Sequence, residues 1–278
     1  LFAESTAPVM AEEVAQFLSI YGKTGANITY EVVSSEEAIR RMIRDTVRYI
    51  VTTRPLSVAE KSQMPKVEGS DLSEIVVAYD GMAVIVHHKN PVEKITTAEL
   101  SKILTGEIRR WEQLSNAESM KGTIEVVFQD TSDVSAFVAR RLLDGKLMRT
   151  TFQRTGSSLA TLRSIVDQPL SIGLVGILWV DSARVPAKVL EVAETRQSTD
   201  TTFRIPPERM GKYSTPHPAN IYRTYYPLKR AIYAYAFGPV AGFASGFGTF
   251  VSNKEGQKLF LNRKIVPATQ PIRLKAPQ

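Results

Sequence analysis

Cysteine is missing from the 278-residue chain, and histidine occurs only three times. Without thiols the protein has neither a catalytic cysteine nor a cysteine metal site, although exported proteins carry disulfides or none and the compartment therefore stays open. His87 and His88 follow each other in a strand-like run, so we expect their side chains to point to opposite faces. His217 lies in a proline-rich stretch, and no histidine pair has the spacing of a metal site.

Long apolar runs are missing as well. None approaches the roughly 20 residues that span a bilayer, and the first residues lack the basic, apolar and cleavage regions of a signal peptide. We therefore expect a soluble chain that has been processed or trimmed. The sequence also lacks a P-loop, a Rossmann glycine fingerprint and a Gly-x-Ser-x-Gly nucleophile elbow. These absences predict a protein that is not an enzyme and that holds neither a cofactor nor a metal.

The composition is that of a globular chain, with 43% hydrophobic and 23% charged residues. A chain of this length can bury a full core and is long for one compact domain, which favours two lobes. The formal charge of +7 favours anionic partners or surfaces through long-range attraction. A basic, solvated exterior explains the same charge equally well.

The first fifty residues alternate between strand and helix signals. Pro8 stands in the first turn of a helix whose apolar residues keep helical spacing up to Tyr21. Ser34 and Glu37 have the spacing of a capping box. The expected elements are strand 1–3, helix 8–21, strand 28–33, a helix after Ser34, and strand 47–51. This order is typical of an α/β fold, in which ligands bind at the loops after the strands.

The stretch from residue 75 to residue 111 is the most strongly specified part of the sequence. The expected features are strand 75–79, a bend at Asp80-Gly81, strand 82–87, a helix opened by the capping box of Thr96 and Glu99, its end at Thr105-Gly106, and the aromatic anchor Trp111.

The second half continues the alternation until residues 198–225, which are polar and rich in proline and predict an irregular surface excursion. The expected elements are strand 124–128, a polar loop at 129–133, a helix with Val134, Phe137, Val138 and Leu142 on one side, helix 157–166, strand 172–176, strand 232–237, and helices 240–251 and 255–261. Tyrosines near Lys229 and Arg230 resemble a nucleic-acid stacking pattern. We instead expect Tyr233 and Tyr235 on one face of a buried strand, and no nucleic-acid partner.

Several motifs resemble one known family when they are taken together. DGMAVIVHHKNPV followed by TTAELSKILTGEIRRW is similar to a long segment of the PstS-like phosphate-binding proteins that feed ABC transporters. Further matches follow in family order and cover most of the chain. They are STAPVMAEEVAQF, TTRPLS, SIGLVG, YPLKRAIYAYAFGP and FVSNKEGQKLFLNRKIVP.

The resemblance implies a two-lobe α/β periplasmic binding protein fold of type II, with a ligand cleft between lobes that close by hinge motion. Lobe 1 would comprise residues 1–79 and 229–278, and lobe 2 residues 80–228. The implied function is capture of inorganic phosphate or a related small oxyanion and its delivery to the membrane subunits of an ABC transporter. The implied protein is an exported monomer of the periplasm or cell envelope, with an N-terminal lipid anchor as its one membrane attachment.

The implied ligand-binding residues lie at the starts of helices, where unpaired N–H groups and a partial positive charge favour oxyanions. They are Ser5, Thr6, Ser35, Thr53, Arg54, Asp80, Thr131, Ser132, Asp133 and Ser135. Several of them have structural alternatives. Ser132 and Asp133 are good N-caps, Asp80 suits a strand bend, and Arg54 is either an anion clamp or the ion-pair partner of Glu36, Glu37 or Asp80.

Two other functions remain open because carboxylates accompany these residues. They are Glu36, Glu37, Asp130 and Asp133, and Thr53 stands where some family members have an aspartate. Ionised carboxylates would repel a desolvated phosphate. The second hypothesis is therefore a PstS-like protein that has lost phosphate binding and serves as an envelope interaction subunit. The third is a cleft that binds a cationic or zwitterionic ligand.

Overall fold

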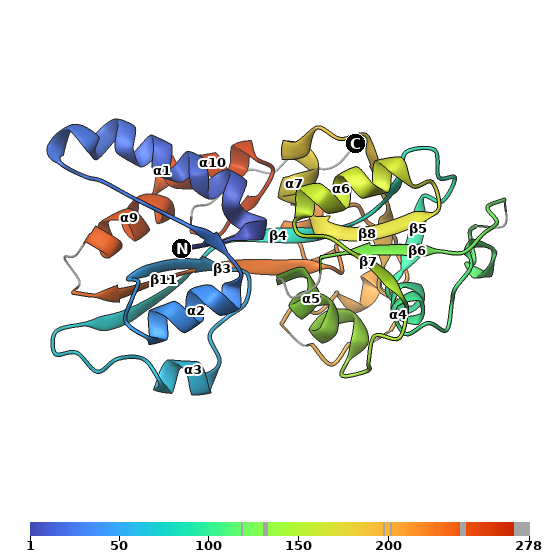
Figure 1. Cartoon of the computed structure of the whole chain (residues 1–278), viewed down its shortest axis with the longest axis horizontal. Coiled ribbons are helices and arrows are strands. Elements are labelled where there is room, and N and C mark those ends of the chain that lie inside the picture. Colours follow the sequence, from blue (N-terminus) through green and yellow to red (C-terminus); the bar gives the residue numbers. More distant parts are fainter. Residues whose placement is uncertain (118, 130–132, 197, 201, 240–242, 270–278) are drawn as a thin grey trace. The chain divides into compact units, whose positions relative to one another are not determined.

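The computed structural model describes residues 1–117, 119–129, 133–196, 198–200, 202–239 and 243–269. These residues form two units (Figure 1). Unit 1 comprises Leu1–Asp80 and the residues from Arg230 onward, and unit 2 comprises Gly81–Lys229. The chain thus crosses between units after Asp80 and after Lys229, whereas the family resemblance implied crossings after Tyr79 and Leu228.

Unit 1 is built on a mixed sheet with the strand order β2-β1-β3-β11-β4, to which β12 adds by pairing with β4. The strands are β1 (Phe2–Ala3), β2 (Val32–Val33), β3 (Tyr49–Thr52), β4 (Asp71–His87), β11 (Lys229–Gly238) and β12 (Val266–Pro267). β1 runs parallel to both of its neighbours, and β11 is antiparallel to β3. The expected strand 28–33 is confined to β2, because residues 29–32 are exposed and bury no apolar stripe.

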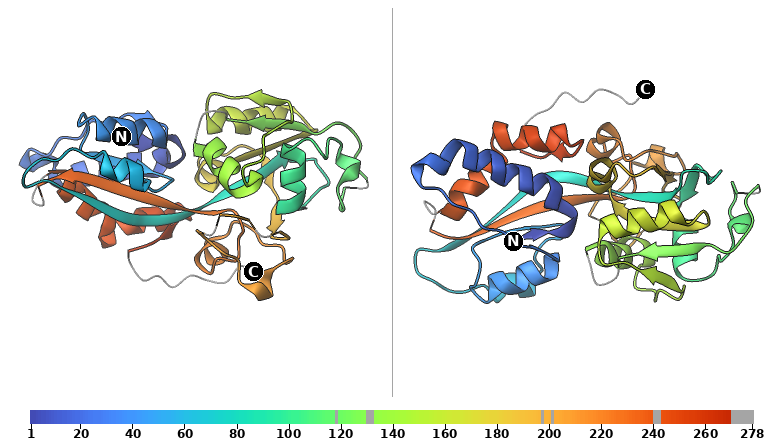
Figure 2. Two further views of the ribbon diagram at one scale, coloured as in Figure 1. Left: turned by 90° about the horizontal axis from the view of Figure 1, so that it is seen from below. Right: turned by 45° about the horizontal axis from the view of Figure 1, so that its top comes forward.

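Helices cover both faces of this sheet. On one face α1 (Ala7–Tyr21), α9 (Phe243–Ser252) and α10 (Lys254–Asn262) pack against one another, as the right view of Figure 2 shows. On the other face α2 (Ser35–Ile43) packs on β3, with α3 (Val58–Ser62) nearby. The apolar residues between α2 and the sheet form a buried cluster, which includes Ala38, Ile39, Met42, Ile50, Tyr235 and Phe237. Tyr233 and Tyr235 stack on this same face, as expected.

The strand β4 runs without interruption through Asp80-Gly81, so the expected bend there is wrong. The left view of Figure 2 shows the strand as one unbroken ribbon. Gly81 is needed for space rather than for a turn. A Cβ atom at this position would lie 3.1 Å from Ile221 and 3.3 Å from Tyr226. Asp80-Gly81 has the sequence of a turn, but here the glycine lets neighbouring side chains pack closely against the strand backbone.

Unit 2 has a sheet with the order β4-β8-β6-β7, and β9 also pairs with β4. Its strands are β6 (Glu125–Phe128), β7 (Phe152–Arg154), β8 (Ser171–Gly176) and β9 (Ala187–Val189), and a separate pair joins β5 (Lys94–Thr96) to β10 (Glu191–Ala193). Its helices are α4 (Thr97–Leu104), α5 (Asp133–Val138), the π-helix η4 (Ala139–Leu143), α6 (Ser158–Asp167), α7 (Ile177–Ala183) and α8 (Pro218–Tyr222). Short 3-10 turns complete the chain at Glu4–Thr6 (η1), Gly22–Thr24 (η2), Trp111–Gln113 (η3) and Pro207–Arg209 (η5).

In unit 2, the sequence correctly predicted those structural features that depend on neighbouring residues. The capping box of Thr96 and Glu99 is formed, and the indole of Trp111 is buried and donates to the carbonyl of Leu170 at 2.9 Å. The expected opposition of His87 and His88 is wrong, because the strand ends at His87 and the two rings lie 4.2 Å apart. Mixed sheets flanked by helices in both units confirm the α/β class. Within the described part of the chain, no helix has the length and apolar character needed to cross a membrane.

Candidate functional site

The loops that follow β1, β2 and β3 carry the expected residues of unit 1. Because β1 is parallel to both of its neighbours, the carboxyl ends of all three strands lie at one edge of the sheet. Ser35 and Thr53 are in direct contact there, since the Thr53 N–H donates to the Ser35 Oγ at 3.0 Å in a buried hydrogen bond. The structure therefore brings together two residues that are 18 positions apart in the sequence.

Ser5 and Thr6 lie at the start of α1, and their hydroxyl groups are used differently. The Thr6 Oγ1 donates to the carbonyl of Ala3 at 2.9 Å, and no side chain caps the first turn of α1. The Ser5 hydroxyl is buried and has no hydrogen-bond partner among the described residues. A buried hydroxyl without a protein partner at the start of a helix can donate to a bound oxyanion.

The two carboxylates at the start of α2 are not equivalent. Glu37 receives hydrogen bonds from both Arg40 and Arg41, and the Arg40 hydrogen bond followed by that of Arg41 lowers its pKa. Ser34 accepts from the Glu37 N–H at 3.1 Å, but the Glu37 side chain does not return to Ser34, so half of the expected capping box forms. Glu36 is exposed. The negative charge of Glu37 is thus balanced by its own helix.

Arg54 forms a two-pronged ion pair with Glu60, with nitrogen-to-oxygen distances of 2.7 and 2.9 Å. This partner was missed, since the expected ones were Glu36, Glu37 and Asp80. The Arg54 hydrogen bond outweighs the opposing effect of burial and lowers the pKa of Glu60 to about 2. Glu60 also closes a capping box with Ser57, and the spacing of those two residues could have revealed it.

Asp80 is buried in β4 and pairs with Arg230 of β11. The Arg230 Nε and Nη2 donate to the same carboxylate oxygen of Asp80, at 3.0 and 2.5 Å. Both side chains are 1% exposed. The remaining nitrogen, Nη1 of Arg230, is buried and has no hydrogen-bond partner in the part of the chain that the structure describes.

The expected residues of unit 2 are described only in part. Thr131, Ser132 and the neighbouring Asp130 lie outside the described residues. Asp133 is the first residue of α5, and Ser135 follows in its first turn, both half-buried. The side chain of Gln129, directly before this loop, is buried and lies 3.5 Å from the hydroxyl of Ser158.

The side chains of this site can recognise a ligand through hydrogen bonds. The residues of unit 1 offer hydroxyl and N–H donors, which suit an oxyanion. Within the described ranges, no cluster of three or more histidine, aspartate or glutamate side chains could hold a metal ion.

A family profile described as "PBP superfamily domain" matches residues 3–255. The chain belongs to the PBP superfamily. Among curated relatives of this PBP protein, the "Phosphate-binding protein PstS" of Borreliella burgdorferi is 24% identical over 206 residues, which cover 71% of this chain and 70% of the relative. PstS of Bacillus subtilis is 25% identical over 207 residues, 73% of this chain and 61% of the relative. The resemblance to PstS-like proteins is therefore confirmed.

Solved structures show that this PBP protein shares its fold with other members. A putative phosphate ABC transporter substrate-binding protein with bound phosphate, from Clostridium perfringens, matches with a TM-score of 0.76 and 20% identity, covering 96% of this chain and 98% of that one. An ABC-type phosphate transport receptor from Vibrio cholerae matches with a TM-score of 0.71 and 17% identity, covering 96% and 99%.

Proposed function

We propose that this PBP-superfamily protein captures inorganic phosphate and delivers it to the membrane subunits of an ABC transporter, without catalysing a reaction. The observation that carries the proposal is the buried Ser5 hydroxyl, which lacks a partner among the described residues at the uncapped start of α1. The linked pair of Ser35 and Thr53 at the same edge of the sheet supports it. Relatives that are named as phosphate-binding proteins support the choice of ligand.

Phosphate is the ligand that these donors suit best. An oxyanion that loses its water needs several hydrogen-bond donors, and charge-assisted bonds to hydroxyl and N–H groups supply them. The proposed contacts in unit 1 are Ser5, Thr6, Ser35 and Thr53. In unit 2 they are Asp133 and Ser135, together with the sequence-based assignments Thr131 and Ser132. Asp80 and Arg54 are proposed as more distant members of the site, since each already pairs with a charged side chain.

We also propose that the protein works as a monomer in the periplasm or cell envelope, held there by an N-terminal lipid anchor. A capture protein of a transporter has to meet its ligand outside the cytoplasmic membrane, and one lipid anchor keeps it near the membrane subunits. The positive charge of the chain would favour anionic surfaces and solutes by long-range attraction.

One argument for the alternative, an interaction subunit that does not bind phosphate, is weakened by the structure. It relied on carboxylates around the site, and Glu37 is paired with two arginines of its own helix. Phosphate near α2 would therefore meet a neutralised side chain rather than a free negative charge.

Calorimetric titration of the dialysed protein with phosphate tests the proposal, with sulfate as a second titrant. We expect micromolar or tighter binding of phosphate. Ser5→Ala should weaken it by about tenfold or more, because a hydrogen bond to a charged group is lost. Ser19→Ala is the matched control, since the Ser19 hydroxyl is exposed and bonds only within α1. A folded protein that gives no heat with phosphate would overturn the proposal.

A further inference from the structure

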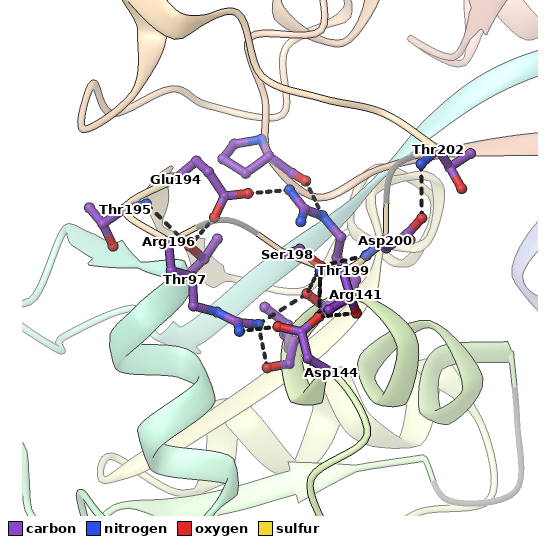
Figure 3. A network of polar contacts seen from close by, with 12 residues as sticks. Thr97, Arg141, Asp144, Glu194, Thr195, Arg196, Ser198, Thr199, Asp200 and Thr202 are labelled. Atoms are coloured by element: carbon purple, nitrogen blue, oxygen red, sulfur yellow. Dashed lines mark hydrogen bonds and ion pairs between the residues drawn. The ribbon is translucent and has the colours of Figure 1, made fainter.

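The C-terminal end of the helix formed by α5 and η4 is bound by a short run of side chains in unit 2. We refer to Glu194, Arg196, Ser198, Thr199 and Asp200 as the clamp segment. Figure 3 shows the hydrogen bonds that join this segment to Arg141 and to Asp144 at the end of the helix. Arg140 of the helix also pairs with Asp200. No sequence pattern indicates this network, because residues 198–225 are polar and rich in proline and predict an irregular excursion.

The centre of the network is the buried ion pair between Arg141 and Glu194. Both oxygens of Glu194 are engaged, one by the Arg141 guanidinium and the other by the Thr97 hydroxyl at 2.5 Å. The Arg141 Nε also donates to the carbonyl of Pro227 at 3.0 Å. Arg141 and Glu194 are only 5% and 4% exposed. The Arg141 side chain is thus tied directly to two other segments of unit 2, and through Glu194 to a third.

The helix end itself is held by Arg196 and Asp144. The Arg196 Nη2 donates to the carbonyls of Arg141 at 3.2 Å and Leu142 at 2.5 Å, which lie at the end of the helix. Asp144 ends the helix in the left-handed region, with φ of 47°. Its carboxylate pairs with Arg196 and accepts from Ser198 and Thr199 at 2.9 and 2.8 Å.

A third ion pair, between Arg140 and Asp200, holds the helix one residue before Arg141. The Arg140 Nε lies 2.9 Å from the Asp200 carboxylate, which is 6% exposed. The helix is therefore fixed from two sides at its last turns, while Asp133 and Ser135 lie at its other end.

Stability alone is a weak reason for burying so many charges. Removing two charges from water has a large cost, and apolar residues of similar size often serve a protein as well or better. What a buried pair adds is a single defined geometry, because its hydrogen bonds fail if either partner shifts. The network therefore fixes the placement of the helix.

We propose that Arg141 and Glu194 are positioning residues for the oxyanion site, an inference that rests on the proposed function for its ligand. α5 rises by about 1.5 Å per residue from Asp133 to Val138, and η4 extends the helix to Leu143. A small tilt at its clamped end therefore moves the other end considerably. Binding residues have to stay within about 0.5 Å of their productive geometry. The clamp segment keeps Asp133 and Ser135 at the distance that phosphate requires.

Hydrogen exchange of backbone amides tests the placement without any ligand. In Glu194→Gln we expect the amides of Phe137 and Val138 to exchange about tenfold faster, while those of Val127 in β6 and Leu174 in β8 keep their wild-type rates. Glu112→Gln, which breaks an ion pair of unit 2 with Arg110, is the matched control and should leave α5 unchanged. Equal acceleration in α5, β6 and β8, or none in α5, would overturn the inference.

Phosphate titration of the same variants adds the functional result. We expect Glu194→Gln to weaken binding about tenfold at a temperature where it is fully folded. Arg141→Lys should weaken binding by a similar factor, because lysine keeps the charge but loses the hydrogen bond to the carbonyl of Pro227. Unchanged affinity in both variants would also overturn the inference. If the wild-type protein does not bind phosphate, the proposed function is refuted. The exchange rates would still decide whether the clamp segment positions the helix.

Discussion

Both units bury an arginine–carboxylate pair, and the two pairs are completed in different ways. In unit 1, two nitrogens of Arg230 share one oxygen of Asp80, and the third nitrogen lacks a hydrogen-bond partner among the described residues. In unit 2, Arg141 and Glu194 are each bonded to a further group. Burial of a charged pair therefore does not by itself define what the pair does in the protein. A network in which both partners are bonded to further groups fixes the geometry of the pair.

Removal of Arg230 should have the largest effect on stability. Arg230→Met leaves the Asp80 carboxylate buried without its countercharge, and we expect the free energy of unfolding to fall by about 4 kcal/mol. Urea denaturation at neutral pH measures this change. The double variant Asp80→Leu with Arg230→Met removes both charges and should recover most of the loss. A double variant as unstable as the single one would show that the side chains matter for packing rather than for charge.

Glu13 of α1 is a buried carboxyl with no ion pair among the described residues, so it extends the comparison to an unpaired group. Burial, with a smaller contribution from Glu12, raises its pKa from 4.5 to about 8. Neither of its oxygens has a hydrogen-bond partner among the described residues. Between these pH values the unfolded chain ionises while the folded one stays protonated, so stability falls as the pH rises.

Glu13→Gln should therefore stabilise the protein by on the order of 3 kcal/mol at pH 8 and have little effect near pH 4. Thermal or urea unfolding of both proteins across this pH range gives the difference. If the two stability curves run parallel from pH 4 to pH 8, Glu13 does not titrate as described.

Removal of Arg141 should cost less than removal of Arg230. In Arg141→Met, Glu194 keeps the hydrogen bond from the Thr97 hydroxyl. We expect a loss of about 2 kcal/mol in the same urea experiment, because the remaining carboxylate is still partly satisfied. Thr97→Val in the Arg141→Met background should then lower stability further. A loss in Arg141→Met that equals or exceeds that in Arg230→Met would contradict the distinction between the two pairs.

The half-exposed pair of Arg54 and Glu60 gives the smallest expected effect. The side chains are 26% and 22% exposed. Arg54→Met should therefore cost only about 1 kcal/mol at neutral pH. Because the folded pKa of Glu60 is lowered to about 2, this contribution is present above about pH 4.5 and is lost as the pH falls toward 2. Phosphate titration of the variant shows in addition whether Arg54 acts on the ligand.

The sequence predicted those features that depend on neighbouring residues. The helix after Thr96, the anchor Trp111 and the α/β class all follow from short patterns of caps and apolar periodicity. It failed where the deciding partner is remote. Asp80 looked like a bend because its partner Arg230 is 150 positions away, and because the residues that crowd Gly81 lie in and near α8, far along the chain.

The same distinction between neighbouring and remote partners applies to the residues of the candidate site. The hydroxyl residues at the strand ends were found from the resemblance, and the contact between Ser35 and Thr53 agrees with a shared sheet edge. The partner of Arg54 was missed, although the spacing of Ser57 and Glu60 carried the signal. The clamp segment could not be found, because side chains from an irregular stretch have no periodic pattern to indicate what they contact.

The division of the chain also affects the order in which the protein can form during synthesis. Unit 2 is one continuous stretch from Gly81 to Lys229, whereas unit 1 needs β11, α9, α10 and β12 from the last part of the chain. In the sheet of unit 1, β11 lies between β3 and β4, and its residues 229–238 are made after those of unit 2. The strands before Asp80 therefore keep exposed apolar surface while unit 2 can already fold. A chaperone that binds unfolded chains would find its longest-lived target in the segment before Asp80.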